Sequence, residues 1–189
     1  MRVFGIDPGS VRTGYGCIDT DGRRHRLVAC GTVTPPAGVA LAERLRVIHR
    51  GLRDLLVAHR PDCVAIENLF HAKNVKSALV LGHARGVAVL AAVDAGAPIV
   101  EYTPASIKAS VVGYGRADKR QMQRMVTLIL GLDAPPSPHD AADALAVAIC
   151  HVHMNGPVAA ATAAAGRAPR HLRSWRHVTP EQLLRRQIP

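Results

Sequence analysis

Several features that would each define a class of protein are missing or scarce in this sequence. Aromatic residues make up only 3% of its 189 residues. No apolar run looks long enough to cross a bilayer or to form a signal peptide, so we expect a cytoplasmic protein with no membrane contact. The four cysteines stand in separate apolar segments without a CxxC pair, which argues against a zinc site or a disulfide framework. No internal repeat is visible.

Acidic residues are also scarce relative to basic ones. The chain has 14 Asp and Glu against 24 Lys and Arg, a net charge of +10. Half of this excess lies in residues 155–189, which hold six arginines, no lysine and a single acid. We expect residues 1–154 to form one folded domain and residues 155–189 to be a basic, Ala/Pro/Arg-rich, disordered tail. The excess in the folded part indicates a polyanionic partner, most simply nucleic acid.

The predicted elements follow the order of an α/β domain. Apolar runs bounded by turn residues predict strands, and apolar residues at helical spacing predict helices. The expected strands are 2–7, 14–20, 26–34, 62–67 and 99–102, the second and third joined by an Asp21-Gly22 turn. The expected helices are 39–59, 75–95, one beginning at Thr103-Pro104, 119–130 with a capping box of Asp118 and Gln121, and one beginning at residues 137–140 and continuing to Cys150.

Asp7 is the most informative residue, because it ends an apolar strand and a Pro-Gly turn follows it directly. A carboxylate buried without a partner is costly, so such a residue usually has a cation to satisfy it. The same anomaly recurs at Glu67, which ends the next apolar run, and at Asp140 and Asp143, which open an alanine-rich helix. Four acids from three separate segments of a basic chain predict an acidic metal pocket.

The chemistry of this pocket follows from its donors. Carboxylate oxygens are hard ligands that suit Mg²⁺ or Mn²⁺ better than zinc. Phosphodiester hydrolysis develops charge on the attacking and the leaving oxygen, and two cations about 3.5–4 Å apart stabilise both. Asp140 and Asp143 are three residues apart, so both lie on one face of their helix. We therefore expect Mg²⁺ or Mn²⁺, two per active site, and acids that repel one another without metal.

Each acid also has a structural explanation. Asp7 could be a turn former, and Glu67 could be a solvated strand end. Asp140 could be the acid of a helix capping box. Asp143 lies past the first helical turn, so its structural explanation is the weakest of the four. His139 adjoins the cluster, but a histidine in a first helical turn is more often a surface residue.

The resemblance to a known family rests on several motifs in a fixed order. Three antiparallel strands, a helix, a parallel strand, a helix and a further strand followed by helices is the order of a ribonuclease H-like domain. The motifs are Phe4-Gly5-Ile6-Asp7-Pro8-Gly9, Ala65-Ile66-Glu67-Asn68-Leu69-Phe70, Ala72-Lys73-Asn74, Gly82-His83-Ala84-Arg85-Gly86, Glu101-Tyr102-Thr103-Pro104, Val111-Val112-Gly113-Tyr114-Gly115 and Asp140-Ala141-Ala142-Asp143-Ala144-Leu145-Ala146. Over roughly residues 1–153 the chain resembles the RuvC family of bacterial Holliday-junction resolvases.

This resemblance implies a fold, an activity and partners. The fold would be a ribonuclease H-like mixed five-stranded sheet with helices on both faces. The activity would be that of a structure-specific endodeoxyribonuclease, a homodimer that resolves four-way DNA junctions by paired, symmetric, metal-dependent hydrolysis during recombination and repair. The family works beside the RuvA–RuvB branch-migration complex, which is therefore an implied partner.

The resemblance also implies roles for single residues. The acids and one lysine would be catalytic: Asp7, Glu67, Asp140, Asp143 and Lys119, the four acids also binding the metal. Lys108 and Lys119 match lysines that approach the scissile phosphate, and Phe70 matches an aromatic that wedges into the junction. The remaining candidates for DNA contacts are Lys73, Lys76 and Arg85, which could equally be solvated charges, and Tyr114 and Arg116, from a glycine-flanked loop.

Two further expectations concern helix faces. Ala78, Gly82 and Gly86 fall four apart, a small-residue stripe that predicts close approach of another helix, within the domain or, our preference, at a dimer interface. His151 and His153 are expected to be helix C-terminal residues that suit the helix dipole.

Three other functions fit part of the sequence. A resolvase-like RNA-processing nuclease shares the first motif, but such chains are generally shorter and lack the segment from Glu101 to Lys119. An actin- or sugar-kinase-like ATPase needs a duplicated domain and a second glycine-rich loop, for which the chain has no room. A catalytically silent junction-binding module would leave four buried acids unexplained.

Overall fold

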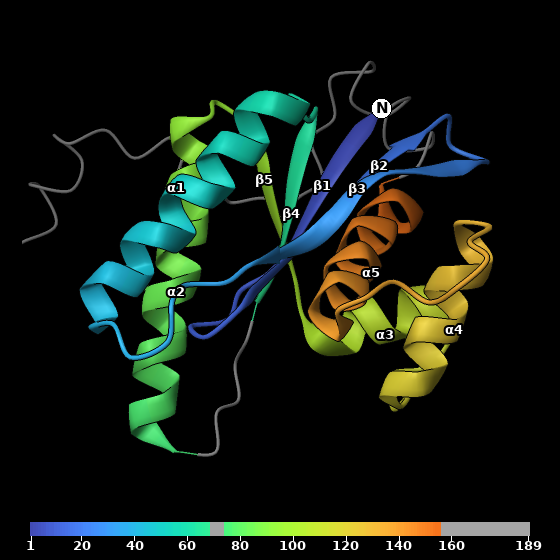
Figure 1. Cartoon of the computed structure of the whole chain (residues 1–189). Coiled ribbons are helices and arrows are strands. Elements are labelled where there is room, and N and C mark those ends of the chain that lie inside the picture. Colours follow the sequence, from blue (N-terminus) through green and yellow to red (C-terminus); the bar gives the residue numbers. More distant parts are fainter. Residues whose placement is uncertain (69–73, 156–189) are drawn as a thin grey trace, which may run out of the picture. The chain divides into compact units, whose positions relative to one another are not determined.

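The computed structural model describes residues 1–68 and 74–155 (Figure 1). The chain divides into two units, Met1–Gly156 and Pro157–Pro189, and every element described belongs to the first. The predicted character of residues 155–189 as a basic tail falls almost wholly outside the described residues and stays a prediction.

Five strands form one mixed sheet in the order β3-β2-β1-β4-β5. The strands are β1 (Arg2–Asp7), β2 (Thr13–Thr20), β3 (His25–Val33), β4 (Cys63–Glu67) and β5 (Ile99–Tyr102). The first three are antiparallel, and β4 and β5 run parallel to β1. This is the predicted sheet.

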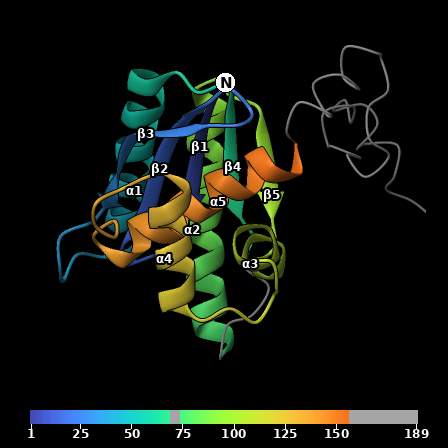
Figure 2. The same cartoon turned by 90° about the vertical axis from the view of Figure 1, so that its right-hand side faces the viewer.

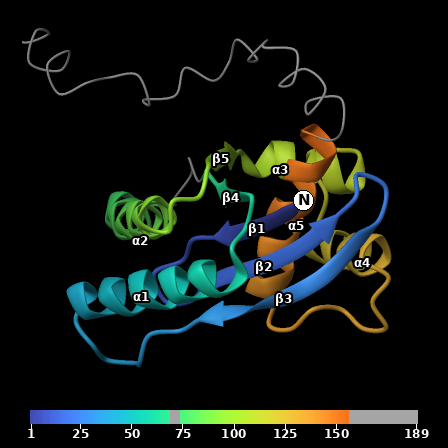
Figure 3. The same cartoon turned by 90° about the horizontal axis from the view of Figure 1, so that it is seen from above.

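Helices cover both faces of the sheet, as predicted (Figures 1 and 3). The helices are α1 (Leu41–His59), α2 (Val75–Asp94), α3 (Pro104–Val112), α4 (Lys119–Ile129) and α5 (His139–Met154). Residues of α1 and α2 form one apolar core with one face of the sheet. Residues of α3, α4 and α5 form a second core with the other face.

The side-chain alternation of β1 decides on which face Asp7 lies. Phe4 and Ile6 belong to the core under α1 and α2, whereas Val3 belongs to the core under α5. Because successive side chains of a strand point to opposite faces, Asp7 shares the α5 face with Val3 and Gly5. The same alternation in β4 buries Ile66 on the α1 side and leaves Glu67 on the α5 side.

Glycines in β1 and β2 let α5 lie directly on the sheet (Figure 2). A Cβ added at Gly5 would lie 2.1 Å from the carbonyl oxygen of Ala144, and one at Gly14 would lie 2.0 Å from that of Asp140. Both distances are too short for any side chain, so only glycine permits this helix–sheet approach. The contact at Gly14 brings the first turn of α5 to the strand that pairs with Asp7.

The predicted helix ends agree closely with the structure. The Thr103 side chain caps α3 with Pro104 at its first turn, and Asp118 and Gln121 form the predicted capping box of α4. Gly22 and Gly131 have the positive φ values of 94° and 60° that their predicted turn and helix-end positions require. The last helix runs four residues beyond Cys150, to Met154.

Helix α2 departs from two expectations. It is long and apolar enough to cross a membrane by length and composition alone, so our prediction that no such run exists was wrong. Its small-residue stripe, Ala78, Gly82 and Gly86, is exposed. A Cβ built at either glycine meets no described atom within 4 Å beyond its chain neighbours and the nearby backbone of its own helix. Close packing inside the described part of the domain therefore does not explain the stripe.

Candidate active site

The sheet and α5 bring the four predicted acids to one end of the domain. Asp7 and Glu67 end the adjacent parallel strands β1 and β4, whose register pairs Ile6 with Ile66. Asp140 and Asp143 lie in the first turns of α5. Three segments remote in sequence thus contribute carboxyl groups to the same place, as predicted.

Asp7 is the most perturbed of these acids. Burial raises its pKa well above the ordinary value, and the negative charges of Glu67, Asp143 and Asp140 raise it further. A hydrogen bond with Glu67 acts in the same direction. The carboxyl therefore lies in a setting that disfavours its ionised form unless a cation is supplied.

Glu67 is perturbed in the same direction but is partly compensated. Burial raises its pKa, the hydrogen bond from Asp7 lowers it, and the charge of Asp143 raises it again. Lys108 and Lys119 lower it by their positive charge. The two lysines therefore act on the cluster from the side of α3 and α4.

The two acids of α5 are paired with cations of the chain. Lys119 Nζ lies 2.9 Å from Asp143 Oδ2, and their side chains are 58% and 27% exposed. Arg12, in the β1–β2 loop, lies 3.5 Å from Asp140 Oδ2 through its Nη1 atom. Arg12 was missed in the sequence, where its distance of 128 residues from Asp140 left no signal of their proximity.

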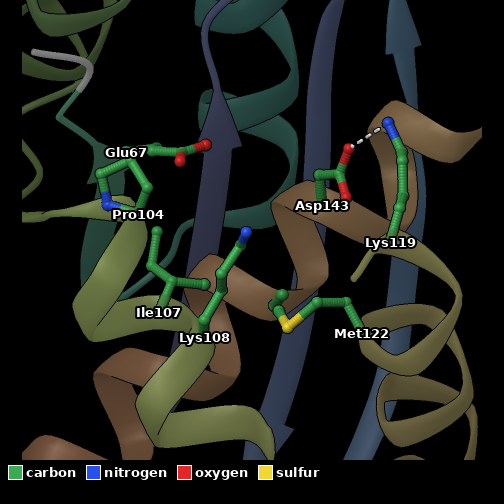
Figure 4. Close-up of a pocket in the computed structure, with 8 residues that line it drawn as sticks. Glu67, Pro104, Ile107, Lys108, Lys119, Met122 and Asp143 are labelled. Carbon is green, nitrogen blue, oxygen red and sulfur yellow. Dashed lines mark ion pairs between the residues drawn. The ribbon is translucent and has the colours of Figure 1, made fainter. Parts of the chain in front are cut away.

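A pocket of about 230 Å³ lies beside the acids (Figure 4). Glu67 lies on one side of it and the Asp143–Lys119 ion pair on the other, with the ammonium group of Lys108 pointing toward the space between them. The floor is apolar and includes Ile107 and Met122. Among residues 1–68 and 74–155, Lys108 has no hydrogen-bond or ion-pair partner. Its charge is therefore available to an anion at the pocket mouth.

Asp140 does not have the structural role that competed with metal binding. The residue that precedes the first turn of α5 is Pro138, and no side chain caps this end. The capping-box explanation of Asp140 is therefore wrong. His139 lies beside the Gln123 side chain of α4.

His151 and His153 lie in the last turn of α5, as predicted, but His151 is not suited to the helix dipole. His151 is buried, with 6% of its surface exposed, and burial lowers its pKa to about 4. Its Nδ1 atom lies 2.9 Å from the hydroxyl of Tyr102, which also accepts a hydrogen bond from Asn155. A neutral ring cannot supply the charge that we expected at the helix dipole. His153 Nδ1 donates to the carbonyl oxygen of Ser110 at 3.0 Å.

The predicted DNA-contacting residues are dispersed. Lys76 and Arg116 are exposed, and Tyr114 is 47% exposed. Arg85 forms an ion pair with Glu101. Phe70 and Lys73 lie outside the described residues.

The donor set fits a divalent metal in its chemistry. All four candidates offer carboxylate oxygens, and the half-buried, mutually repelling pair of Asp7 and Glu67 is stabilised by added positive charge. In the described ranges, however, no three His, Cys, Asp or Glu side chains are close enough to hold one ion. The ion pairs of Asp143 with Lys119 and of Asp140 with Arg12 draw these carboxylates toward cations of the chain.

This sheet order, with acids at the ends of β1 and β4 and at the start of α5, defines a ribonuclease H-like resolvase. Residues 3–151 match the family described as crossover junction endodeoxyribonuclease RuvC. The chain therefore belongs to the RuvC family, whose members are metal-dependent nucleases that hydrolyse phosphodiester bonds.

Individual relatives agree with this assignment. RuvC of Chloroflexus aggregans is 53% identical over 153 residues, which are 81% of this chain and 93% of the relative. RuvC of Caldanaerobacter subterraneus is 49% identical over 155 residues, 82% of this chain and 94% of the relative. The structure of Thermus thermophilus RuvC in complex with Holliday junction substrate is similar with a TM-score of 0.77 and 35% identity, over 82% of this chain and 94% of that one.

Proposed function

We propose that this chain resolves four-way DNA junctions in recombination and repair, and that Asp7, Glu67, Asp140 and Asp143 carry the reaction by binding Mg²⁺ or Mn²⁺, two ions per site. The observation that supports this most directly is Asp7. It is half-buried among three other acids from distant segments, an arrangement that costs folding free energy and gains its benefit when cations bind.

The chain's own residues prepare the site for hydrolysis. The cations, when bound, would polarise the phosphate and activate water. The four carboxylates would hold and orient them. Lys108, which faces the space between Glu67 and Asp143 (Figure 4), would bind a non-bridging oxygen of the scissile phosphate and offset the charge that develops there.

Lys119 would change partners during this reaction. In the structure it neutralises Asp143 at 2.9 Å. With Asp143 holding a cation, the ammonium group of Lys119 would be free to bind the phosphate, where it would stabilise or protonate the leaving oxygen. The exposed side chains of Lys76, Tyr114 and Arg116 would contact the strands farther from the cut, and Phe70 and Lys73 remain predicted contacts outside the described residues.

A homodimer is the second part of the proposal. The stripe of Ala78, Gly82 and Gly86 is exposed and has no neighbour within the described domain. On the same helix Val75 is 77% and Leu79 61% exposed, which gives a second copy an apolar surface to bury. A dimer with twofold symmetry would place two sites on a substrate with twofold symmetry, so that paired cuts follow. A cytoplasmic location and cooperation with RuvA–RuvB stay predictions from family resemblance.

The decisive experiment compares substrates under one set of conditions. A synthetic four-way junction, a linear duplex of the same sequence and a structured RNA are incubated with the protein and Mg²⁺ or Mn²⁺, and products are mapped at nucleotide resolution. We expect symmetric cuts of the junction alone, with 5′-phosphate ends. Equal cleavage of the linear duplex, or preference for RNA, would contradict the proposal.

A further inference from the structure

The end of β5 carries an ion pair on the sheet face opposite the acids. Glu101 is paired in register with Ile66, which is buried on the α1 and α2 side of the sheet. From α2, Arg85 forms an ion pair and hydrogen bond with Glu101. Asn68, which follows the neighbouring strand β4, donates through its side-chain amide to Glu101 Oε2 at 3.4 Å.

Asn68 is the residue that directly follows Glu67. Its backbone N–H donates to the carbonyl oxygen of Tyr102 at 2.7 Å, and its side chain reaches Glu101. Two adjacent residues of β5 therefore hold the point at which the chain leaves β4. Because Glu67 is the last residue of that strand, its backbone is held between the strand ladder and these contacts.

The surroundings of Arg85 are unlike those of a phosphate-binding side chain. Its side chain is 30% exposed, and its Nε atom is buried without a hydrogen-bond partner in the described part of the chain. Its guanidinium is bound through Nη2 to the Glu101 carboxylate, and its buried Nε atom is not accessible to DNA. Its charge is also neutralised by Glu101.

We propose that Arg85 and Glu101 are positioning residues for Glu67, acting through Asn68, rather than contacts to DNA. This inference rests on the proposed function, in which Glu67 binds metal. A carboxylate that binds two cations must be placed to within a fraction of an ångström, and a displacement of about 1 Å can cost roughly 100-fold in rate. Arg85 fixes Glu101, Glu101 fixes Asn68, and Asn68 fixes the end of β4.

The pair of residues permits a test in which the two roles predict opposite results. The variants are Arg85→Ala, Glu101→Ala, the conservative Glu101→Gln, and the exchanged double variant Arg85→Glu with Glu101→Arg. Cleavage is measured in single turnovers with saturating excess enzyme, so that the rate constant is separated from the fraction of active protein. Junction binding is measured in an Asp7→Asn background at several salt concentrations.

If the pair positions Glu67, both alanine variants lower the rate constant by at least about 10-fold, with unchanged amplitude and unchanged junction affinity. The half-saturating Mn²⁺ concentration, followed by electron paramagnetic resonance without DNA, rises in both. Glu101→Gln keeps an acceptor oxygen and loses less. The exchanged variant restores an ion pair but not the acceptor of the Asn68 amide, so it recovers only part of the rate.

If Arg85 instead binds a phosphate, different results appear. Arg85→Ala weakens junction binding and reduces its salt dependence, Glu101→Ala leaves the rate constant unchanged, and the exchanged variant binds worst of all. Any of these overturns the inference. Failure of the proposed function is distinguishable, since the wild-type protein would then not cut junctions, while the Mn²⁺ affinities of the variants would still test the positioning role.

Discussion

The two ends of α5 bury polar groups in opposite ways. At its N-terminal end Asp140 and Asp143 join Asp7 and Glu67, and burial together with like charge raises the pKa values of the latter two. At its C-terminal end a neutral His151 is hydrogen-bonded within a network that includes Tyr102 and Asn155. One end is left with repulsion that only cations relieve, and the other has its polar groups satisfied within the chain.

This difference distinguishes the N-terminal end of α5, which forms the candidate site, from the C-terminal end, which anchors the helix. Satisfied buried polar groups specify one docking of the helix. Unsatisfied like charges cost stability and persist at sites where a ligand completes them. Both properties reside on one helix of sixteen residues, so the rigid end holds the reactive end in place.

The largest effect is expected from removing the charge of the most buried acid. Asp7→Asn should lower junction cleavage by at least about 1,000-fold, the equivalent of about 4 kcal/mol of lost transition-state stabilisation. Junction affinity should stay near the wild-type value, because the change removes no positive charge. Gel-shift titration and single-turnover cleavage measure the two quantities. Undiminished cleavage would remove Asp7 from the reaction.

The next effect concerns the C-terminal end of α5 and appears in the pH dependence of the free energy of unfolding. His151 has a pKa of about 4 in the folded protein and about 6.5 when unfolded. The unfolded state thus binds more protons between these two pH values. As the pH is lowered through this window, His151 therefore reduces the free energy of unfolding by about 3 kcal/mol. Urea unfolding from pH 7 to pH 4 measures it.

A matched pair of variants isolates this contribution. His151→Gln removes the titrating ring, so its stability should decline less steeply with falling pH. His83→Gln alters an exposed histidine of α2 and should keep the wild-type slope. Equal slopes in all three proteins would show that His151 is not the group responsible.

A third change moves the acid end of α5 without altering an acid. In Gly14→Ala the new methyl group meets the Asp140 carbonyl oxygen at 2.0 Å. We expect a loss of about 1–3 kcal/mol in stability and of up to about 100-fold in cleavage, because the first turn of α5 must shift.

Its control is Gly16→Ala, whose methyl group meets Leu145, beyond the acids. This variant should lose comparable stability but retain more cleavage per folded molecule. If both lose cleavage equally, the position of the first turn is not what matters.

The smallest effect concerns the thermal stability of the end of the domain that carries the four acids. Without metal, Asp7→Asn should raise the temperature of unfolding slightly, because an amide relieves the repulsion that raises the pKa of the native carboxyl. Added Mn²⁺ should stabilise the wild-type protein and leave the variant nearly unchanged. Differential scanning calorimetry measures both, and a destabilised metal-free variant would contradict the repulsion.

Much of this protein could be predicted from local patterns. Strand and helix ranges follow from apolar periodicity, and Thr103 and Asp118 were identified as caps by their own sequence context. Asp7 and Glu67 were identified because an acid at the end of a buried strand is anomalous wherever that strand lies. These signals depend only on residues adjacent in the sequence, so they can be recognised without knowing the tertiary contacts.

The partners of charged residues could not be predicted in the same way. Arg85 was a candidate for DNA contact or a solvated charge, and its ion pair with Glu101 of β5 was not foreseen. The ion pair of Arg12 with Asp140, 128 residues away in sequence, was not foreseen either. His151 was correctly placed in the last helical turn, but its burial and its contact with Tyr102 were not foreseen. Each outcome requires the packing of elements that no sequence window contains.

The sequence by itself determined which segments become strands and helices, and which acids are out of place in them, because periodicity and capping are properties of neighbouring residues. Only the tertiary structure decided that these acids meet. Their meeting depends on strand order and on glycines that let α5 touch the sheet at Gly5 and Gly14, and such contacts exist only when distant parts of the chain pack together.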